Sequence, residues 1–302
     1  MVTPSTKIDA TAGLSQLPAF KSGSRIPSFF FAHGTPALMK ESGRSISPDF
    51  PGAHDGPHAD FLRAFGPYLL RTYAPKAIVV ISAHWETEKG DPIQIAQNTE
   101  AWQTENLYYD YYGFADAMYN LKFASRGDAG IAGRVKELLD GSGIPNETLI
   151  NKRGLDHGCF IPFKLMFGDA CPVPIVEVSQ YTDLEENFRL GESLAQLSRE
   201  GVLVLAGGLT IHTFRDFAAF SPSTAKDGYK DFEAHLKRAV VLEPGSARLA
   251  GIREATKHEY YRLAHPAIEH FTPIAVAAGA GMDGGARVLS DLHGTISVAF
   301  GV

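Results

Sequence analysis

The chain has little cysteine: Cys159 and Cys171 are the only two among its 302 residues. Two cysteines build no disulfide framework, and their spacing gives no CxxC pair for zinc. The low cysteine content favours a reducing, intracellular compartment, so we expect the protein to be cytoplasmic.

Positive charge and long apolar runs are also scarce. The 28 Lys and Arg residues are outnumbered by 34 Asp and Glu residues, and the formal net charge is -6. Nucleic-acid binding needs clustered Lys and Arg to neutralise phosphates, so no nucleic-acid partner is expected. No apolar run approaches the ~18 to 20 residues that cross a bilayer, so no membrane partner is expected either.

What the chain does contain is typical of a globular protein. Hydrophobic residues make up 44% of it and charged residues 21%, which is enough apolar material for a packed core. Residues 1–25 are rich in Ser, Thr, Ala and Lys and lack the apolar stretch of a secretory signal. We find no internal repeat and no shift in composition. We therefore expect a flexible arm over residues 1–25 and one folded domain over residues 26–302.

The pattern of apolar residues predicts an α/β fold. Short runs rich in β-branched and aromatic residues indicate buried strands over residues 28–32, 77–82, 174–179, 202–206 and 295–300. Between them, apolar residues at helical spacing over residues 131–139 and 188–197 predict amphipathic helices. Loops are expected over residues 43–56 and 97–113. This alternation predicts a single domain with a central, mostly parallel or mixed sheet flanked by helices.

Histidines follow three of the predicted strands. His33 and His84 come directly after two of them, and His212 lies a few residues beyond a third, across a Gly207-Gly208 turn. In open α/β sheets, ligands gather beyond the carboxyl ends of the strands, where residues distant in sequence converge. Imidazole is the commonest protein ligand for zinc and iron. The spacing therefore indicates a metal site, with a surface or hydrogen-bonded core role as the alternative for each histidine alone.

Two further histidines are candidates for chemistry. His157, in a Gly-Leu-Asp-His-Gly segment, could act as an acid or base, or could be a turn residue bonded to backbone. His270 precedes a small, apolar stretch and could begin a buried helix, where capping or packing is the alternative. No chemistry is assigned to the histidines expected in polar loops or on solvated helix faces, which are His54, His58, His235 and His258. The roles of His265 and His293 stay open.

Five segments around these histidines stand out when they are taken in order. They are His33-Gly34-Thr35-Pro36, Ile81-Ser82-Ala83-His84-Trp85-Glu86-Thr87, Lys152-Arg153-Gly154-Leu155-Asp156-His157-Gly158, the Gly-rich turn before His212, and His265-Pro266 followed by Glu269-His270-Phe271. In this order they resemble the class III extradiol ring-cleavage dioxygenases, in the branch of the 4,5-DOPA dioxygenases. The resemblance covers most of the chain.

The resemblance implies a role for each motif histidine. His33, His84 and His270 would ligate the metal, with His212 as a fourth ligand or a near neighbour. His157 would be the catalytic acid-base residue. Glu269 could supply an oxygen ligand, but neighbouring side chains on a helix diverge by about 100°, so Glu269 and His270 are not expected to bind one ion together.

The resemblance also implies the cofactor and the substrates. Fe(II) is expected as the catalytic metal, with Zn(II) possible as the bound or physiological ion. The substrates would be a small aromatic diol and O2, and the ring would open beside the diol. A zinc-dependent hydrolase using the same histidines is an alternative function, and a non-catalytic binding protein of the same fold is another. The oligomeric state stays open.

The chain departs from the family pattern in three places. Gly207-Gly208-Leu209 stands where relatives carry a turn with a polar side chain. Cys159 follows the Asp-His-Gly unit and could be a reactive thiol or a small packed residue. Residues 108–114, Tyr-Tyr-Asp-Tyr-Tyr-Gly-Phe, are more aromatic than usual, and could line a pocket for a ring or pack on the sheet.

Overall fold

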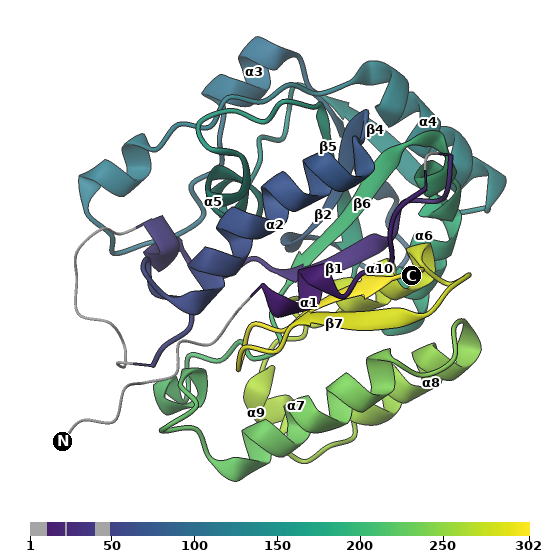
Figure 1. Ribbon diagram of the computed structural model, residues 1–302. Coiled ribbons are helices and arrows are strands. Elements are labelled where there is room, and N and C mark those ends of the chain that lie inside the picture. The colour runs from purple at the N-terminus through teal and green to yellow at the C-terminus, as the bar shows by residue number, and fades with distance from the viewer. Residues whose placement is uncertain (1–10, 22, 40–48) are drawn as a thin grey trace.

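The computed structural model describes residues 11–21, 23–39 and 49–302. Its centre is an eight-stranded mixed sheet in the order β4-β3-β5-β2-β6-β1-β8-β7 (Figure 1). The strands are β1 (Ser28–Ala32), β2 (Ala77–Thr87), β3 (Ile93–Gln97), β4 (Asn146–Ile150), β5 (Ile175–Tyr181), β6 (Val202–Gly208), β7 (Ala286–Ser290) and β8 (Ser297–Phe300). The expected α/β fold with a mixed sheet is confirmed.

Helices cover both faces of this sheet. The α-helices are α1 (Ala12–Ser15), α2 (Pro57–Tyr73), α3 (Glu100–Glu105), α4 (Ala129–Gly141), α5 (His157–Phe167), α6 (Leu184–Leu194), α7 (Asp227–Val240), α8 (Ser246–Ala255), α9 (Tyr261–Ala264) and α10 (Pro273–Ala280). Short 3-10 helices are η1 (Pro36–Met39), η2 (Asp116–Asn120), η3 (Ala195–Glu200) and η4 (Phe217–Phe220). None of the described helices has both the length and the apolar character needed to cross a membrane.

Two hydrophobic cores lie on opposite faces of the sheet. Successive strand side chains point to opposite faces, so Phe29 and Phe31 pack with the buried residues of α2 and α5. Phe30 points the other way and belongs to the core that contains the buried residues of α4, α6 and α10. Burial on both faces explains why the central strands are continuous apolar runs instead of alternating ones.

The strands that the apolar runs predicted are all present, and three more were missed. The missed strands are β3, β4 and β7, which lie toward the edges of the sheet. All side chains of β4 are half-buried or exposed, and so are those of β7 from Ala286 to Val288. Both strands therefore lack a continuous apolar run. The stretch expected to be irregular from residue 97 also contains helix α3.

The four strands at the centre of the sheet, β5, β2, β6 and β1, run parallel to one another. Their carboxyl ends therefore meet at one edge. The prediction that His84 follows its strand was wrong, because β2 continues to Thr87. Its pairing with β5 shifts register between Ile81 and Glu86. Such an irregularity re-aims side chains at the rim of a sheet.

The arm expected over residues 1–25 lies partly outside the described residues. In the part that the structure describes, helix α1 contacts β7, and Leu14 and Leu17 are buried. Of the loop expected over residues 43–56, the structure describes only residues 49–56, which form turns before α2.

Candidate metal centre

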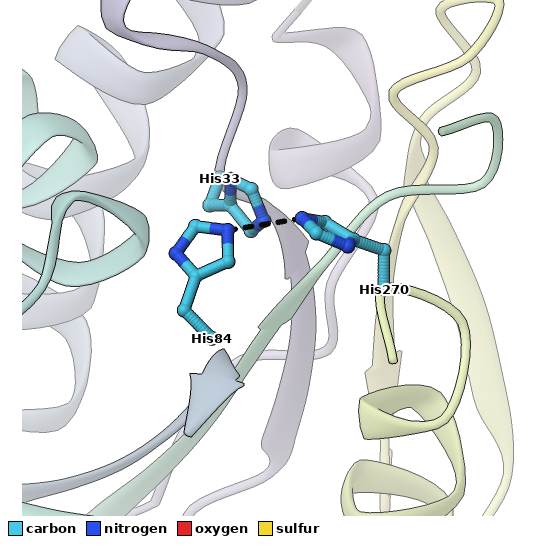
Figure 2. A group of neighbouring side chains, drawn as sticks. All are labelled: His33, His84 and His270. Carbon is cyan, nitrogen blue, oxygen red and sulfur yellow. Dashed lines mark hydrogen bonds between the residues drawn. The ribbon is translucent and has the colours of Figure 1, made fainter. Parts of the chain in front are cut away.

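Three histidines from distant parts of the chain point toward one another at the carboxyl edge of the sheet (Figure 2). His33 directly follows β1, and His84 lies in the last third of β2. His270 lies in a turn three residues before α10, so the helix itself begins later than the sequence suggested. The backbone N–H of Leu209, just after β6, donates to the His270 carbonyl at 2.8 Å and fixes that turn against the sheet.

The three imidazoles form a compact triangle. The His33 ring centroid lies 4.9 Å from that of His84 and 5.1 Å from that of His270, and the latter two are 4.9 Å apart. One ligand atom from each ring lies within 4.8 Å of the other two. The Nε2 atoms of His84 and His270 are only 3.0 Å apart. We call these three residues the histidine triad.

Each triad ring is held by a hydrogen bond from its Nδ1 atom. The acceptors are the Gly34 carbonyl oxygen for His33 at 2.8 Å, Asp156 Oδ1 for His84 at 3.2 Å and Glu269 Oε1 for His270 at 2.8 Å. An oxygen acceptor places the ring proton on Nδ1 and leaves the Nε2 lone pair free. All three Nε2 lone pairs are thus available at the centre of the triangle.

This arrangement fits a divalent cation. Nε2 of His33 is buried and has no hydrogen-bond partner, and the Nε2 atoms of His84 and His270 lie 3.0 Å apart, close enough to share one positive charge. Burial lowers the pKa of both His33 and His270 well below the usual value, which keeps these rings neutral and able to coordinate. Burial also opposes protonation of His84, but Asp156 and Asp110 more than offset it and raise its pKa.

Two glycines make room for the triad. A Cβ on Gly158 would lie 2.9 Å from Nδ1 of His84, and one on Gly208 would lie 2.3 Å from the carbonyl oxygen of His270. Either side chain would force its surroundings to shift. The prediction of a turn at Gly207-Gly208 was wrong, because both residues belong to the end of β6, where Gly208 allows a close approach of backbone to backbone.

Asp156 connects the triad to helix α5. It is the N-cap residue of that helix, and its Oδ1 accepts from the Gly158 N–H at 2.8 Å and from Ser82 Oγ at 2.9 Å. Its Oδ2 accepts from Arg153 at 2.7 Å. Burial alone would raise the pKa of Asp156, but the hydrogen bond with His84 and the nearby positive charges hold it well below its usual range. This buried carboxylate both caps α5 and orients His84.

His157 lies beside the triad and has its own carboxylate partner. Its ring stacks on that of His84 with centroids 4.2 Å apart, and its Nδ1 is 2.7 Å from Oδ1 of Asp110. The same oxygen accepts from the His157 backbone N–H at 3.0 Å. The hydrogen bond assigns the ring proton to Nδ1, so Nε2 is free to take a proton from a bound molecule.

His212 is adjacent to the triad but belongs to a different group of possible ligands. Its ring stacks on that of His270 with centroids 3.5 Å apart, and its Nδ1 is 3.6 Å from Glu269 Oε1. The ligand atoms within reach of His212 are those of Glu269 and His270, whereas His33 and His84 belong to the triad. Burial and the neighbouring histidines lower the pKa of His212 to about 4.

The five motif histidines open onto one cavity of about 560 Å³. Most of its other wall residues are aromatic, namely Phe50, Tyr111, Tyr112, Phe114, Phe214, Phe217 and Phe220. The aromatic segment at residues 108–114 therefore contributes to a pocket wall. A mostly apolar cavity with a few convergent polar groups is the usual form of a small-molecule site.

The family model described as the catalytic LigB subunit of aromatic ring-opening dioxygenase matches residues 27–301. The chain belongs to this family.

Its relatives within the dioxygenase family are similar over most of their length. The 4,5-DOPA dioxygenase extradiol-like protein of Schizosaccharomyces pombe is 41% identical, over 92% of each chain. The 4,5-DOPA dioxygenase extradiol of Beta vulgaris is 33% identical, over 83% of this chain and 85% of its own. A crystal structure of an uncharacterized Escherichia coli K12 protein has the same fold, with a TM-score of 0.67 and 22% identity over 91% of this chain and 100% of the other.

The remaining histidines and Cys159 lie away from the centre of this dioxygenase-family site. His58 was expected in a polar loop or on a solvated helix face, and this was wrong: it is fully buried, because the side of α2 that carries it packs into the hydrophobic core beside Phe61. His265 is buried and hydrogen-bonded to the Thr210 carbonyl at 2.9 Å, and His293 contacts Glu233 at 2.6 Å. Cys159 is buried, and burial raises the pKa of its thiol well above the usual value, as in a packed, unreactive residue.

Sequence reasoning missed the two aspartates that orient the site. Asp156 is the first residue of the Asp-His-Gly motif, and an Asp directly before a helix signals an N-cap. No motif in the sequence marks Asp110 as a partner of a histidine, because it lies among tyrosines in a segment whose aromatic composition indicates a pocket wall. Its partner, His157, is 47 residues away in sequence.

Proposed function

We propose that this protein is an extradiol dioxygenase that opens the ring of a catechol with O2, with Fe(II) held by His33, His84 and His270. The observation that carries the proposal is the convergence of three free Nε2 lone pairs at the inner end of an aromatic cavity. Family membership supports the reaction type.

Fe(II), when bound, supplies a centre that both a catechol and O2 can reach and that can move electrons between them. The residues of the chain bind the substrate and transfer its protons. The aromatic walls hold the catechol ring and keep water out. Nε2 of His157 takes a proton from a catechol hydroxyl, and Asp110, bonded to the opposite nitrogen, stabilises the imidazolium that results.

The reaction balances without a further reductant. The carbon–carbon bond between a hydroxyl-bearing carbon and its unsubstituted neighbour breaks, and both atoms of O2 enter the product. One becomes a carboxylate oxygen and the other an aldehyde oxygen. The ring gives up four electrons, which reduce O2, and His157 can return its proton as the ring opens.

We assign His212 to the substrate side of the site and not to the metal. Its ring lies face to face with His270, and it shares Glu269 with that residue. Two stacked rings direct their nitrogen lone pairs along parallel planes, so they do not converge on one ion as the triad does. A neutral His212 can donate a hydrogen bond to a catechol oxygen.

The test is anaerobic loading with Fe(II), followed by admission of air and a panel of catechols. We expect a yellow ring-opened product and uptake of one O2 per ring opened. The His33→Ala variant is the matched control and should form no product.

Two results would contradict the proposal. One is the absence of a ring-opened product with every catechol, in protein that retains its iron. The other is hydrolysis of esters or amides by the zinc-loaded protein in place of ring opening, which would assign the triad to a zinc hydrolase.

A further inference from the structure

The cavity has two chemically different ends. The histidines and Asp110 lie at the inner end, where their polar atoms are engaged with one another or face the metal position. The rest of the wall is apolar, apart from Thr35 and tyrosine rings. A catechol whose diol faces the triad must direct its ring substituent toward this apolar part.

Among the described residues, those that line the cavity include no Lys or Arg. The only carboxylate among the described wall residues, Asp110, lies within hydrogen-bond reach of His157 at 2.7 Å and forms an ion pair with His84 at 3.3 Å. Within the part of the chain that the structure describes, a substrate carboxylate in the outer part would meet no Lys or Arg, and a substrate ammonium would meet no free carboxylate. Burying either charge without a partner is strongly unfavourable.

The mouth of the cavity exposes aromatic rings to water. Tyr112 is 89% exposed, Phe214 72% and Phe217 54%. Phe214 and Phe217 have ring centroids 6.4 Å apart, and Phe217 is equally far from Phe220, so the three rings form a continuous wall. Exposed aromatic surface that continues into a cavity is typical of a ligand-binding groove. An apolar ring substituent that extends away from the metal end of the cavity can pack against this aromatic wall.

We propose that the substrate is a catechol with an uncharged, apolar substituent, alkyl or aryl, and not one with an amino-acid or carboxylate side chain. This inference rests on the proposed ring-opening function. The volume of about 560 Å³ lies in the range that takes drug-sized ligands, which leaves room for such a substituent beside the ring.

The test compares three catechols with the same three-carbon side chain: 4-propylcatechol, which is uncharged, dihydrocaffeate, which is an anion, and L-DOPA, which is a zwitterion. We expect kcat/KM for 4-propylcatechol to exceed that for each charged compound by about tenfold or more. Calorimetric binding to the zinc-loaded protein, which cannot reduce O2, should give the same order of affinity. A preference for dihydrocaffeate or L-DOPA in both measurements would overturn the inference.

A variant tests the role of the wall directly. Phe217→Arg introduces a cation at a half-exposed position, where it does not disturb the core. It should improve kcat/KM for dihydrocaffeate relative to 4-propylcatechol by about tenfold, whereas Phe217→Leu should keep the wild-type order. If the arginine leaves the order unchanged, the aromatic wall does not contact the substituent and the inference is wrong.

Failure of this inference differs from failure of the proposed function. If the iron-loaded protein opens L-DOPA faster than 4-propylcatechol, the ring-opening function stands and the substituent assignment fails. If it opens none of the three and the zinc-loaded protein still binds 4-propylcatechol most tightly, the cavity assignment stands and the reaction assignment fails.

Discussion

At the scale of single residues, the proposed ligand set predicts which variants lose metal. Removing His33 takes away a buried, otherwise unpartnered Nε2 atom, so His33→Ala should lose bound metal. His84→Ala and His270→Ala should do the same. Metal content measured by mass spectrometry after Fe(II) loading checks this, with His235→Ala, at an exposed position on α7, as the control. Full metal content in His33→Ala would contradict the ligand assignment.

His157 should affect turnover and not metal content. It bonds to Asp110 and stacks on His84, and its loss leaves the triad intact. We expect His157→Ala to reduce kcat by about 10²- to 10⁴-fold, the usual contribution of a general acid-base group. Asp110→Asn should reduce kcat less, because an amide oxygen can still accept from Nδ1. Loss of metal from His157→Ala would show that this residue is a ligand.

His58 should make the stability of the protein depend on pH. Burial lowers its pKa to about 4, whereas in the unfolded chain it titrates near 6.5. Between these values the unfolded chain binds a proton that the folded protein does not. The folded state therefore loses stability as the pH falls from about 6.5 toward 4.

The His58→Phe variant tests this dependence. Urea unfolding at about pH 7 and about pH 4.5 should give a decrease in unfolding free energy that is about 2 to 3 kcal/mol smaller in the variant than in the wild type. The other histidines are common to both proteins and cancel in the comparison. An equal decrease in both proteins would mean that His58 titrates normally in the fold.

At the scale of elements, helix α5 places both His157 and the residues that hold His84. Gly158 lies in its first turn, and a Cβ there would collide with the His84 ring. Gly158→Ala should displace that ring and weaken metal binding by about 10-fold or more, comparable to the loss of an outer partner of a metal ligand. Metal titration followed by calorimetry measures the effect.

Gly133→Ala is the matched control for this substitution. Gly133 also lies in a helix, α4, and no described atom outside the local backbone of that helix lies within 4 Å of the position its Cβ would take. Alanine should stabilise that helix by about 0.5 to 1 kcal/mol and leave metal affinity unchanged. Equal metal affinity in both variants would remove the steric argument for Gly158.

At the scale of the whole molecule, the triad joins distant parts of the chain. His33 and His84 follow or lie in central strands, while His270 belongs to the C-terminal segment before α10. A bound ion links these segments in the folded state only, so metal at about 100 times its Kd should add about 2.7 kcal/mol of stability. Thermal unfolding with Fe(II) under nitrogen, and again with EDTA, should differ by several degrees. No difference in the wild type would argue against a site formed by the fold, and His33→Ala should show none.

The amino-acid sequence by itself determined the central strands, because residues 28–32, 77–82 and 202–206 are short, apolar on both faces and rich in β-branched or aromatic residues or leucine, as strands buried on both sides are. It also contained the motif histidines in an order that indicated the family. The edge strands β4 and β7 could not be predicted, since half-exposed strands lack a continuous apolar run. Their pairing is determined by neighbours that are distant in sequence.

Only the tertiary structure showed which histidines lie close together. Their positions after strands made His33, His84 and His212 equal candidates for metal ligands. In the fold, His270 lies beside His33 and His84, and the ring of His212 stacks on that of His270. The Nδ1 partners of His33 and His270 are their chain neighbours Gly34 and Glu269, whereas Asp156, the partner of His84, comes from another element of the fold. A sequence lists the side chains at the ends of strands, whereas the distances between their rings are set only after the strands are packed.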